Sequence, residues 1–396
     1  MEYIRKKPLN PLLKYPGGKQ RELKYIIPKV PQKINRYFEP FVGGGAVFMS
    51  MNNDELHIND MSYELINLYS FVKNENEVFD DNVSRIQYYW DLLKTITFNH
   101  EIELVDYYLK YKNEELKEEE LKEIISEFID LHATEFNGLL NGDFNVGIDN
   151  FISETNKSLL SKMRRMKRIE SKINLKEDHE GKYKLLSNED IVQNIETAFK
   201  AALYSHFRYI YNNKEEYRIT EEFYTAIYFF IREYCFSSMF RYGPTGNFNV
   251  PFGGNSYSKK SLLNKINHFK SPEVQEHLSK TRIYNEDYLT FMRRFDLSTN
   301  DFVFLDPPYD TEFKTYAQNE FNLDKHLELA NYLKSECKAN FMMVVKKTSN
   351  MEELYTDGTL LDTGRTLKVE VFKKSYFVSF KDRNKRNVEH MIITNY

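Results

Sequence analysis

At both ends of the chain, short apolar runs alternate with segments whose apolar residues recur with the period of a helix. Near the N-terminus the runs indicate two buried strands, each followed by a helical pattern: strands at residues 37–42 and 57–60, helices at 46–51 and 63–73. Toward the C-terminus the predicted strands lie at residues 281–284, 301–305 and 341–345, with a terminal antiparallel pair at 369–380 and 388–394. Short strands alternating with helices predict an α/β fold with a mostly parallel, doubly wound, Rossmann-like sheet.

The middle of the chain has a different pattern. Long charged helical segments at residues 101–132 and 191–211 are followed by a Tyr/Phe-rich segment at 223–240 and a turn-rich stretch at 243–247. We therefore predict a second, mainly helical domain inserted between two strands of the first. The predicted bounds are 1–75 and 281–396 for the sheet domain and 76–280 for the insert.

Charge and cysteine content narrow the function classes. The net charge of -4 argues weakly against a nucleic-acid partner. Basic residues gather at 162–168 and 381–386, however, and acidic ones at 114–127, so an acidic protein can still present a basic face. Cys235 and Cys337 belong to no Cys/His cluster, which predicts neither a disulfide framework nor a metal site. The start of the chain lacks an apolar signal core and no run is long enough to span a bilayer, so we expect a cytoplasmic protein with no membrane partner.

A glycine-rich loop follows the first predicted strand. In the segment Phe38-Glu39-Pro40-Phe41-Val42-Gly43-Gly44-Gly45, glycines allow a ligand to approach the backbone closely, and a following helix offers unpaired N–H groups. Asp60 ends the next strand, where a carboxylate can accept both hydroxyls of a ribose. A nicotinamide dinucleotide site is disfavoured, because Phe48 stands where its fingerprint requires a third glycine.

The tetrapeptide Asp306-Pro307-Pro308-Tyr309 directly follows the apolar run 302–305. A carboxylate followed by two prolines and an aromatic residue suits methylation of an amino group such as that of adenine. The exocyclic nitrogen of adenine is a poor nucleophile because its lone pair is delocalised into the ring. The Asp306 carboxylate and the Pro307 carbonyl can each accept one of its N–H bonds and direct the lone pair at a methyl donor. Pro307 and Pro308 hold the strand end rigid and leave the Pro307 carbonyl free. Tyr309 can stack on a base that has been rotated out of the duplex.

With these motifs in view, the chain resembles the Dam-like (alpha-group) family of site-specific DNA adenine-N6 methyltransferases nearly end to end. The run Leu13-Lys14-Tyr15-Pro16-Gly17-Gly18-Lys19 is similar to the family's N-terminal cofactor motif. The resemblance implies S-adenosyl-L-methionine as the cofactor and a doubly wound methyltransferase sheet with an inserted target recognition domain. The residues that it implies for cofactor binding are Tyr15, Lys19, Phe41, Gly43, Gly45, Asp60, Asp287 and Asp306.

Within the insert, residues 246–253 are similar to a segment of the family's target recognition domain. Arg241, Asn247 and Asn249 are candidate DNA-binding residues, because Arg and Asn side chains can read guanine and adenine edges with two hydrogen bonds. Thr245 stands where several GATC-specific members carry a basic side chain, so the target sequence stays open. The segment from residue 77 to 200 is longer than in compact members of the family.

The resemblance implies methyl transfer to the N6 amino group of a flipped-out adenine in double-stranded DNA. The setting is either a restriction-modification system, with a cognate restriction endonuclease as partner, or an orphan or phage enzyme. A methyltransferase acting on RNA adenine or on a protein glutamine amide remains an alternative, because the tetrapeptide suits any planar amide-like nitrogen. Cytosine-N4 enzymes usually carry Ser in place of Asp306. A DNA-binding regulator without catalysis would be expected to have lost Asp306, Tyr309 or the glycine loop, and all are intact.

Overall fold

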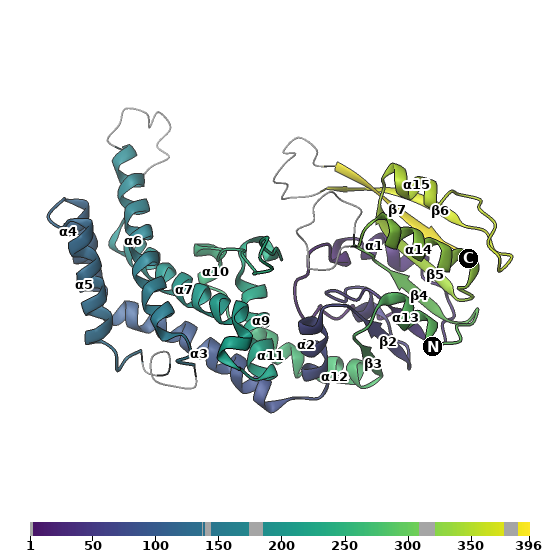
Figure 1. Ribbon diagram of the computed structural model, residues 1–396, viewed down its shortest axis with the longest axis horizontal. Helices are drawn as coiled ribbons and strands as arrows, with labels where there is room; N and C mark the ends of the chain where they lie inside the picture. Colours follow the sequence, from purple (N-terminus) through teal and green to yellow (C-terminus); the bar gives the residue numbers. More distant parts are fainter. Residues whose placement is uncertain (1–2, 137, 139–143, 174–184, 309–320, 376–386) are drawn as a thin grey trace. The chain divides into compact units, whose positions relative to one another are not determined.

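The protein is described from a computed structural model, which covers residues 3–136, 138, 144–173, 185–308, 321–375 and 387–396 (Figure 1). The chain divides into two compact units. Unit 1 comprises Met1–Asn76, Phe240–Tyr242 and Asn267–Tyr396, and unit 2 comprises Glu77–Met239 and Gly243–Ile266.

Among the described residues of unit 1, seven strands form one sheet in the order β3-β2-β1-β4-β5-β7-β6 (Figure 1). The five parallel strands are β1 (Tyr37–Glu39), β2 (Leu56–Asn59), β3 (Thr281–Tyr284), β4 (Phe302–Leu305) and β5 (Asn340–Lys346). The antiparallel pair is β6 (Lys368–Ser375) and β7 (Asn387–Thr394), and β7 pairs with β5. The predicted mostly parallel, doubly wound sheet is confirmed. β1, β2 and β4 are buried along their whole length, which is why they read as apolar runs without alternation.

Helices and single turns of 3-10 helix connect these strands. In unit 1 they are η1 (Lys19–Arg21), α1 (Leu23–Ile26), η2 (Ile27–Lys29), η3 (Phe48–Ser50), α2 (Tyr63–Lys73), α12 (Pro272–Ser279), α13 (Tyr288–Arg293), α14 (Leu323–Ser335) and α15 (Ser349–Leu354). The helix expected at residues 63–73 is present as α2, capped by the Ser62 hydroxyl. The prediction of a helix at residues 46–51 is wrong. Only η3 forms there, because Met51 turns extended and bridges to Ile4.

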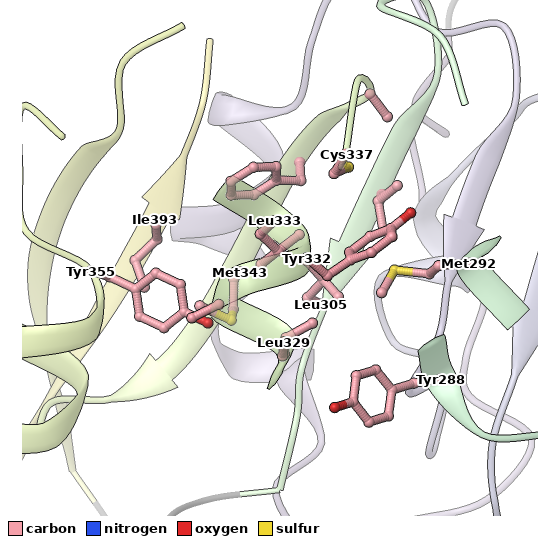
Figure 2. Packing of buried hydrophobic residues seen from close by; sticks show 14 of the residues in the cluster. Tyr288, Met292, Leu305, Leu329, Tyr332, Leu333, Cys337, Met343, Tyr355 and Ile393 are labelled. Carbon is pink, nitrogen blue, oxygen red and sulfur yellow. The ribbon is translucent and has the colours of Figure 1, made fainter. Parts of the chain in front are cut away.

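A buried apolar cluster holds the strand ends in place on one face of the sheet. Leu305 of β4 and Met343 of β5 pack with Leu329 and Leu333 of α14, and Tyr355 closes the cluster beyond α15 (Figure 2). All five side chains are at most 1% exposed. Because interiors packed this densely resist displacement, the residue that follows Leu305 has a well-defined position.

Unit 2 is mainly helical, as expected. Its elements are α3 (Glu77–Asn99), α4 (Glu101–Lys112), α5 (Glu118–Leu131), α6 (Ile148–Ile173), α7 (Asn188–Asn212), α8 (Lys214–Tyr217), α9 (Glu221–Tyr234), η4 (Phe236–Ser238) and α10 (Asn255–Ser258). The helical segment expected at residues 101–132 is two helices, α4 and α5, since the chain turns at Glu114, which has a positive φ of 65°. Trp90 of α3 packs against Phe230 and Tyr234 of α9. Among the described helices of the chain, none is long and apolar enough to cross a membrane.

The second unit ends earlier than residue 280, where the sequence analysis placed the end of the insert. Helix α11 (Leu263–Phe269) crosses from unit 2 into unit 1, and α12 belongs to unit 1. The Gln275 side chain of α12 donates to the Val72 carbonyl of α2 at 3.0 Å, and the Leu56 N–H of β2 donates to the Lys280 carbonyl at 3.1 Å. These bonds attach residues 267–280 to the sheet unit, which a periodicity pattern along the chain does not reveal.

Candidate active site

Four neighbouring parallel strands bring most of the predicted site residues to one edge of the sheet. The glycine loop follows β1, Asp60 follows β2, Asp287 comes after β3, and Asp306 follows β4. The strands are in register, with Glu39 of β1 beside Ile58 of β2 and Asn59 of β2 beside Tyr284 of β3. The chain order reverses between β1 and β4, and open α/β sheets bind their ligands beside such a reversal.

Lys19 and Asp306 form an ion pair at this edge, although 287 positions separate them in the sequence. The Lys19 side chain is 3% exposed and the Asp306 side chain 20%. A turn delivers Lys19 to this position: Gly17 has a φ of 78°, the Gly18 N–H donates to the Tyr15 carbonyl, and Lys19 Nζ also donates to the Gly17 carbonyl at 3.1 Å. The ammonium group therefore stabilises the ionised form of Asp306 and restrains its orientation.

The Tyr15 ring packs directly on the glycine loop. A Cβ atom added to Gly43 would lie 3.2 Å from Tyr15 Cδ1, and one added to Gly44 would lie 3.0 Å from Tyr15 Cβ. At Gly45, which has a φ of 71°, an added Cβ would lie 2.4 Å from the Tyr69 hydroxyl oxygen. These close approaches give a physical reason for three consecutive glycines at this point of the chain.

Asp60 is bonded to the same loop. Its Oδ2 accepts the Gly43 N–H at 2.9 Å and its Oδ1 accepts the Ser62 N–H at 3.0 Å. Burial raises the pKa of Asp60 above its ordinary value, and the N–H groups of Ser62 and Gly43 act in the opposite direction. The carboxylate thus joins the loop after β1 to the start of α2.

Asn59 connects the loops after β1 and β3, a role that the sequence analysis missed. Its Nδ2 donates to the carbonyls of Pro40 and Glu286 at 3.1 and 3.0 Å, and its Oδ1 accepts the Glu286 N–H at 3.0 Å. The next residue, Asp287, caps α13 by accepting the Leu289 N–H at 2.9 Å. An amide side chain at the end of a fully buried strand is the signal that points to such a bridging role, since buried polar groups require partners.

Glu39 is a second residue that the sequence analysis did not single out as a site residue. Its side chain is buried and accepts a hydrogen bond from the Tyr37 hydroxyl. Burial raises the pKa of Glu39 well above its ordinary value, the Tyr37 hydrogen bond opposes that change, and the negative charge of Asp306 adds to it. A carboxyl at the end of an apolar strand, immediately before the glycine loop, is the signal in the sequence.

The remaining predicted residues of this site have different surroundings. The Phe41 ring lies 5.1 Å from the Tyr288 ring and 5.5 Å from the Phe321 ring, measured between centroids. In the tetrapeptide, Pro307 is buried and Pro308 is exposed. Tyr309 lies outside the described residues, so its predicted stacking role stays a prediction.

The three predicted DNA-binding residues belong to different units. Arg241 is exposed in unit 1, whereas Asn247 and Asn249 are exposed in unit 2. Between and after the two asparagines, Phe248 and Val250 are buried. The Asn212 side chain of α7 bonds the Phe248 N–H and carbonyl at 2.8 and 3.0 Å, and the Tyr204 hydroxyl donates to the Val250 carbonyl at 2.8 Å. An anchored segment that points alternate side chains outward is suited to recognition.

The basic run at residues 162–168 lies on α6 and is partly neutralised within unit 2. Arg164 makes a two-pronged ion pair with Glu118, and Lys167 pairs with Glu114 at 3.3 Å. Burial lowers the pKa of Lys162 to about 8. Arg165 and Arg168 are exposed. The other basic segment, residues 381–386, lies outside the described residues.

Comparisons with known proteins agree with this arrangement. The family described as D12 class N6 adenine-specific DNA methyltransferase matches residues 15–180 and 173–369. The chain is similar to "Type II methyltransferase M.CviBI" of Paramecium bursaria Chlorella virus NC1A, with 33% identity over 172 residues, which cover 43% of this chain and 60% of that protein. It is also similar to "Type II methyltransferase M1.LlaDCHI" of Lactococcus lactis subsp. cremoris, with 31% identity over 171 residues, covering 34% and 59%.

The chain thus spans about 60% of the length of these two curated relatives. A third relative, "Type II methyltransferase M.MjaIII" of Methanocaldococcus jannaschii, is 24% identical over 403 residues, which cover 98% of this chain and 99% of that protein. The match to the family, in contrast, extends over most of the chain and includes both the glycine loop and the tetrapeptide.

Proposed function

We propose, on the premise that this chain belongs to the D12 class N6 adenine-specific DNA methyltransferases, that it transfers a methyl group from S-adenosyl-L-methionine to the N6 amino group of adenine in double-stranded DNA. The observation that carries the proposal is the Asp306 carboxylate, which pairs with Lys19 at the end of β4, at the same sheet edge as the glycine loop. A carboxylate in this position can accept a hydrogen bond from an amino group that is about to be methylated.

The donor set suits S-adenosyl-L-methionine. The Asp60 oxygens accept the N–H groups of Gly43 and Ser62, and a carboxylate has further lone pairs with which it can accept a ribose hydroxyl. Tyr15 and Phe41 offer aromatic surfaces, Gly43 and Gly45 leave room beside the backbone, and Asp287 can accept from an amino group through its second oxygen. When bound, the cofactor supplies a methyl group on a positively charged sulfur that departs as a neutral thioether.

The protein's part in the reaction is positioning. Asp306 and the Pro307 carbonyl each accept one N–H bond of the adenine amino group, which directs the nitrogen lone pair toward the methyl carbon. The amino proton becomes acidic only as the methyl group transfers, so Asp306 accepts it without having to act as a strong base. Lys19 keeps Asp306 ionised and in place before the base enters.

We further propose that unit 2 selects the DNA sequence. Asn247 and Asn249 are exposed on an anchored segment, and an asparagine amide can bond both the N6 and N7 atoms of an adenine edge. Arg165 and Arg168 of α6 are exposed and suited to phosphates, which position the duplex without reading its sequence. Three relatives named type II methyltransferases support a restriction-modification setting with an endonuclease of the same specificity as partner.

The decisive experiment is expression of the full chain in a host that lacks DNA methylation, followed by modification-sensitive long-read sequencing of the host DNA. We expect N6-methyladenine at one defined motif, and no such mark with Asp306→Ala. Purified Asp306→Ala protein should still bind the duplex that carries the motif. An unmodified genome, together with methyl transfer to RNA or to a glutamine peptide in vitro, would contradict the proposal.

A further inference from the structure

Two histidines and two glutamates come together at one end of the α4–α5 helix pair in unit 2. His100 is the N-cap of α4, Glu103 lies in its first turn, His132 is the C-cap of α5, and Glu135 follows three residues later. The two imidazole ring centroids lie 3.9 Å apart. His100 Nδ1 and His132 Nε2 each lie 3.9 Å from Glu103 Oε2, so three donor atoms from two helices face a common point.

Glu135 bonds the opposite nitrogen of each imidazole. Its Oε1 lies 2.8 Å from His100 Nε2 and 3.1 Å from His132 Nδ1. Because a carboxylate accepts, these two nitrogens carry the protons in the neutral imidazoles, and His100 Nδ1 and His132 Nε2 then keep their lone pairs. Histidines that bind metal ions almost always donate their other N–H to a carboxylate, carbonyl or water in this way.

The third donor is oriented in a similar way. The Tyr107 hydroxyl donates to Glu103 Oε1, so Oε2 is the oxygen that faces the imidazoles. His132 Nε2 is buried and makes no hydrogen bond to any described residue. A buried lone pair with no hydrogen-bond partner is costly unless something binds it, and the facing carboxylate oxygen at 3.9 Å is too distant to do so.

We propose that His100, His132 and Glu103 bind one divalent transition-metal cation, with water completing its coordination, and that this ion clamps α4 to α5. Two donors that each lie about 2.1 Å from a shared zinc ion are about 3.4 Å apart in tetrahedral geometry. Two of the three donor pairs are 3.9 Å apart and all three donor atoms lie within 4.8 Å of one another, so the donors must close by about 0.5 to 1.4 Å, which rotamer adjustment can supply. Two imidazoles and one carboxylate favour zinc over magnesium or calcium, which prefer oxygen ligands.

The ion would have a structural role within the long segment that links the glycine loop to the recognition region. It lies outside the residues proposed for methyl transfer, all of which belong to unit 1. The proposal is therefore independent of the catalytic one, and either can fail without the other. If no ion binds, the four side chains are held by hydrogen bonds alone, and the experiment below distinguishes the two cases.

The test uses full-length protein without an affinity tag, stripped with a chelator and titrated with Co²⁺, whose visible absorption reports coordination by nitrogen and oxygen. We expect one saturable site per chain, displacement of Co²⁺ by Zn²⁺, and a higher melting temperature with Zn²⁺. His132→Gln and Glu103→Gln should each abolish the saturable absorption. Glu135→Gln, which removes only the outer carboxylate, should weaken Zn²⁺ binding by about 10- to 100-fold. His268→Gln, at a histidine of unit 1, is the matched control and should bind normally.

Circular dichroism and methyl transfer to DNA show whether each variant is folded, because none of these residues belongs to the catalytic machinery. If His132→Gln fails to fold, Glu103→Gln carries the test. The proposal is overturned if folded wild-type protein gives no stoichiometric Co²⁺ absorption. It is equally overturned if binding survives in both ligand variants with the affinity of the His268→Gln control.

Discussion

Lys19→Met is the most informative single substitution in the proposed active site. Lys19 Nζ pairs with Asp306, and the two side chains are 3% and 20% exposed. Methionine keeps the length and most of the apolar volume of the lysine stem but removes the positive charge. Asp306 then loses the ion that stabilises its charged form. A carboxyl in that environment takes up its proton at a higher pH than before.

The size of the effect follows from the geometry of the pair. An opposite charge in contact with a carboxylate moves its titration by about 1 to 3 pH units. Asp306 is partly open to water, which screens this interaction. If catalysis requires ionised Asp306, the acid limb of kcat/KM should move to higher pH. Activity at alkaline pH should be much less affected.

The measurement is methyl transfer to a duplex oligonucleotide across the acid range, at saturating cofactor because Lys19 is also a proposed cofactor ligand. Lys24→Met, at an exposed lysine of α1, is the matched control and removes the same charge from the same unit. Its acid limb should coincide with that of the wild-type enzyme. If the Lys19→Met profile also coincides with the wild-type profile while its overall rate falls, Lys19 does not control the ionisation of Asp306, and the assigned role is wrong.

Three further substitutions test the surroundings of the site. Gly45→Ala should destabilise the protein by about 2 kcal/mol or more, because the residue has a positive φ and the added Cβ clashes with Tyr69. Gly358→Ala is the control and should lower stability less, because Gly358 has a similar φ but no neighbouring atom within 4 Å of an added Cβ. Equal losses of stability in urea unfolding would exclude the clash. Asp60→Ala should raise the cofactor dissociation constant measured by calorimetry. It should also lower the melting temperature, since it removes the hydrogen bonds from the Gly43 and Ser62 N–H groups. Wild-type cofactor affinity would argue against the ribose role of Asp60. Glu39→Gln should raise the free energy of unfolding, and this gain should grow as the pH rises above about 4.5. Burial raises the pKa of Glu39 in the folded protein, so once the unfolded chain ionises this carboxyl, the wild-type side chain opposes folding. A gain that is constant with pH would show that Glu39 titrates normally.

The sequence by itself determined the sheet and the composition of its active edge. Apolar runs followed by glycines, by Asp60 and by Asp306 predict strands and the polar groups at their ends. Because parallel strands end at the same edge, the approximate location of the site follows from the strand order alone. These features are local, since each depends on residues a few positions apart. The helix expected at residues 46–51 failed because a distant residue, Ile4, pairs with its end.

Tertiary structure alone decided which side chains meet. Asp306 pairs with Lys19, Tyr15 covers Gly43, and Asn59 joins two loops, none of which a periodicity or motif specifies. Because Cys235 and Cys337 belong to no Cys/His cluster in the sequence, the sequence predicts that the chain has no metal site. The packing of α4 on α5 nevertheless brings His100 and His132, which lie on different helices, into contact. Likewise, the sequence suggests that the basic run on α6 is available for DNA, but in the structure Arg164 of this run forms an ion pair with Glu118 of α5. Such contacts join residues far apart in the chain, and their distances are set by how whole helices and strands pack.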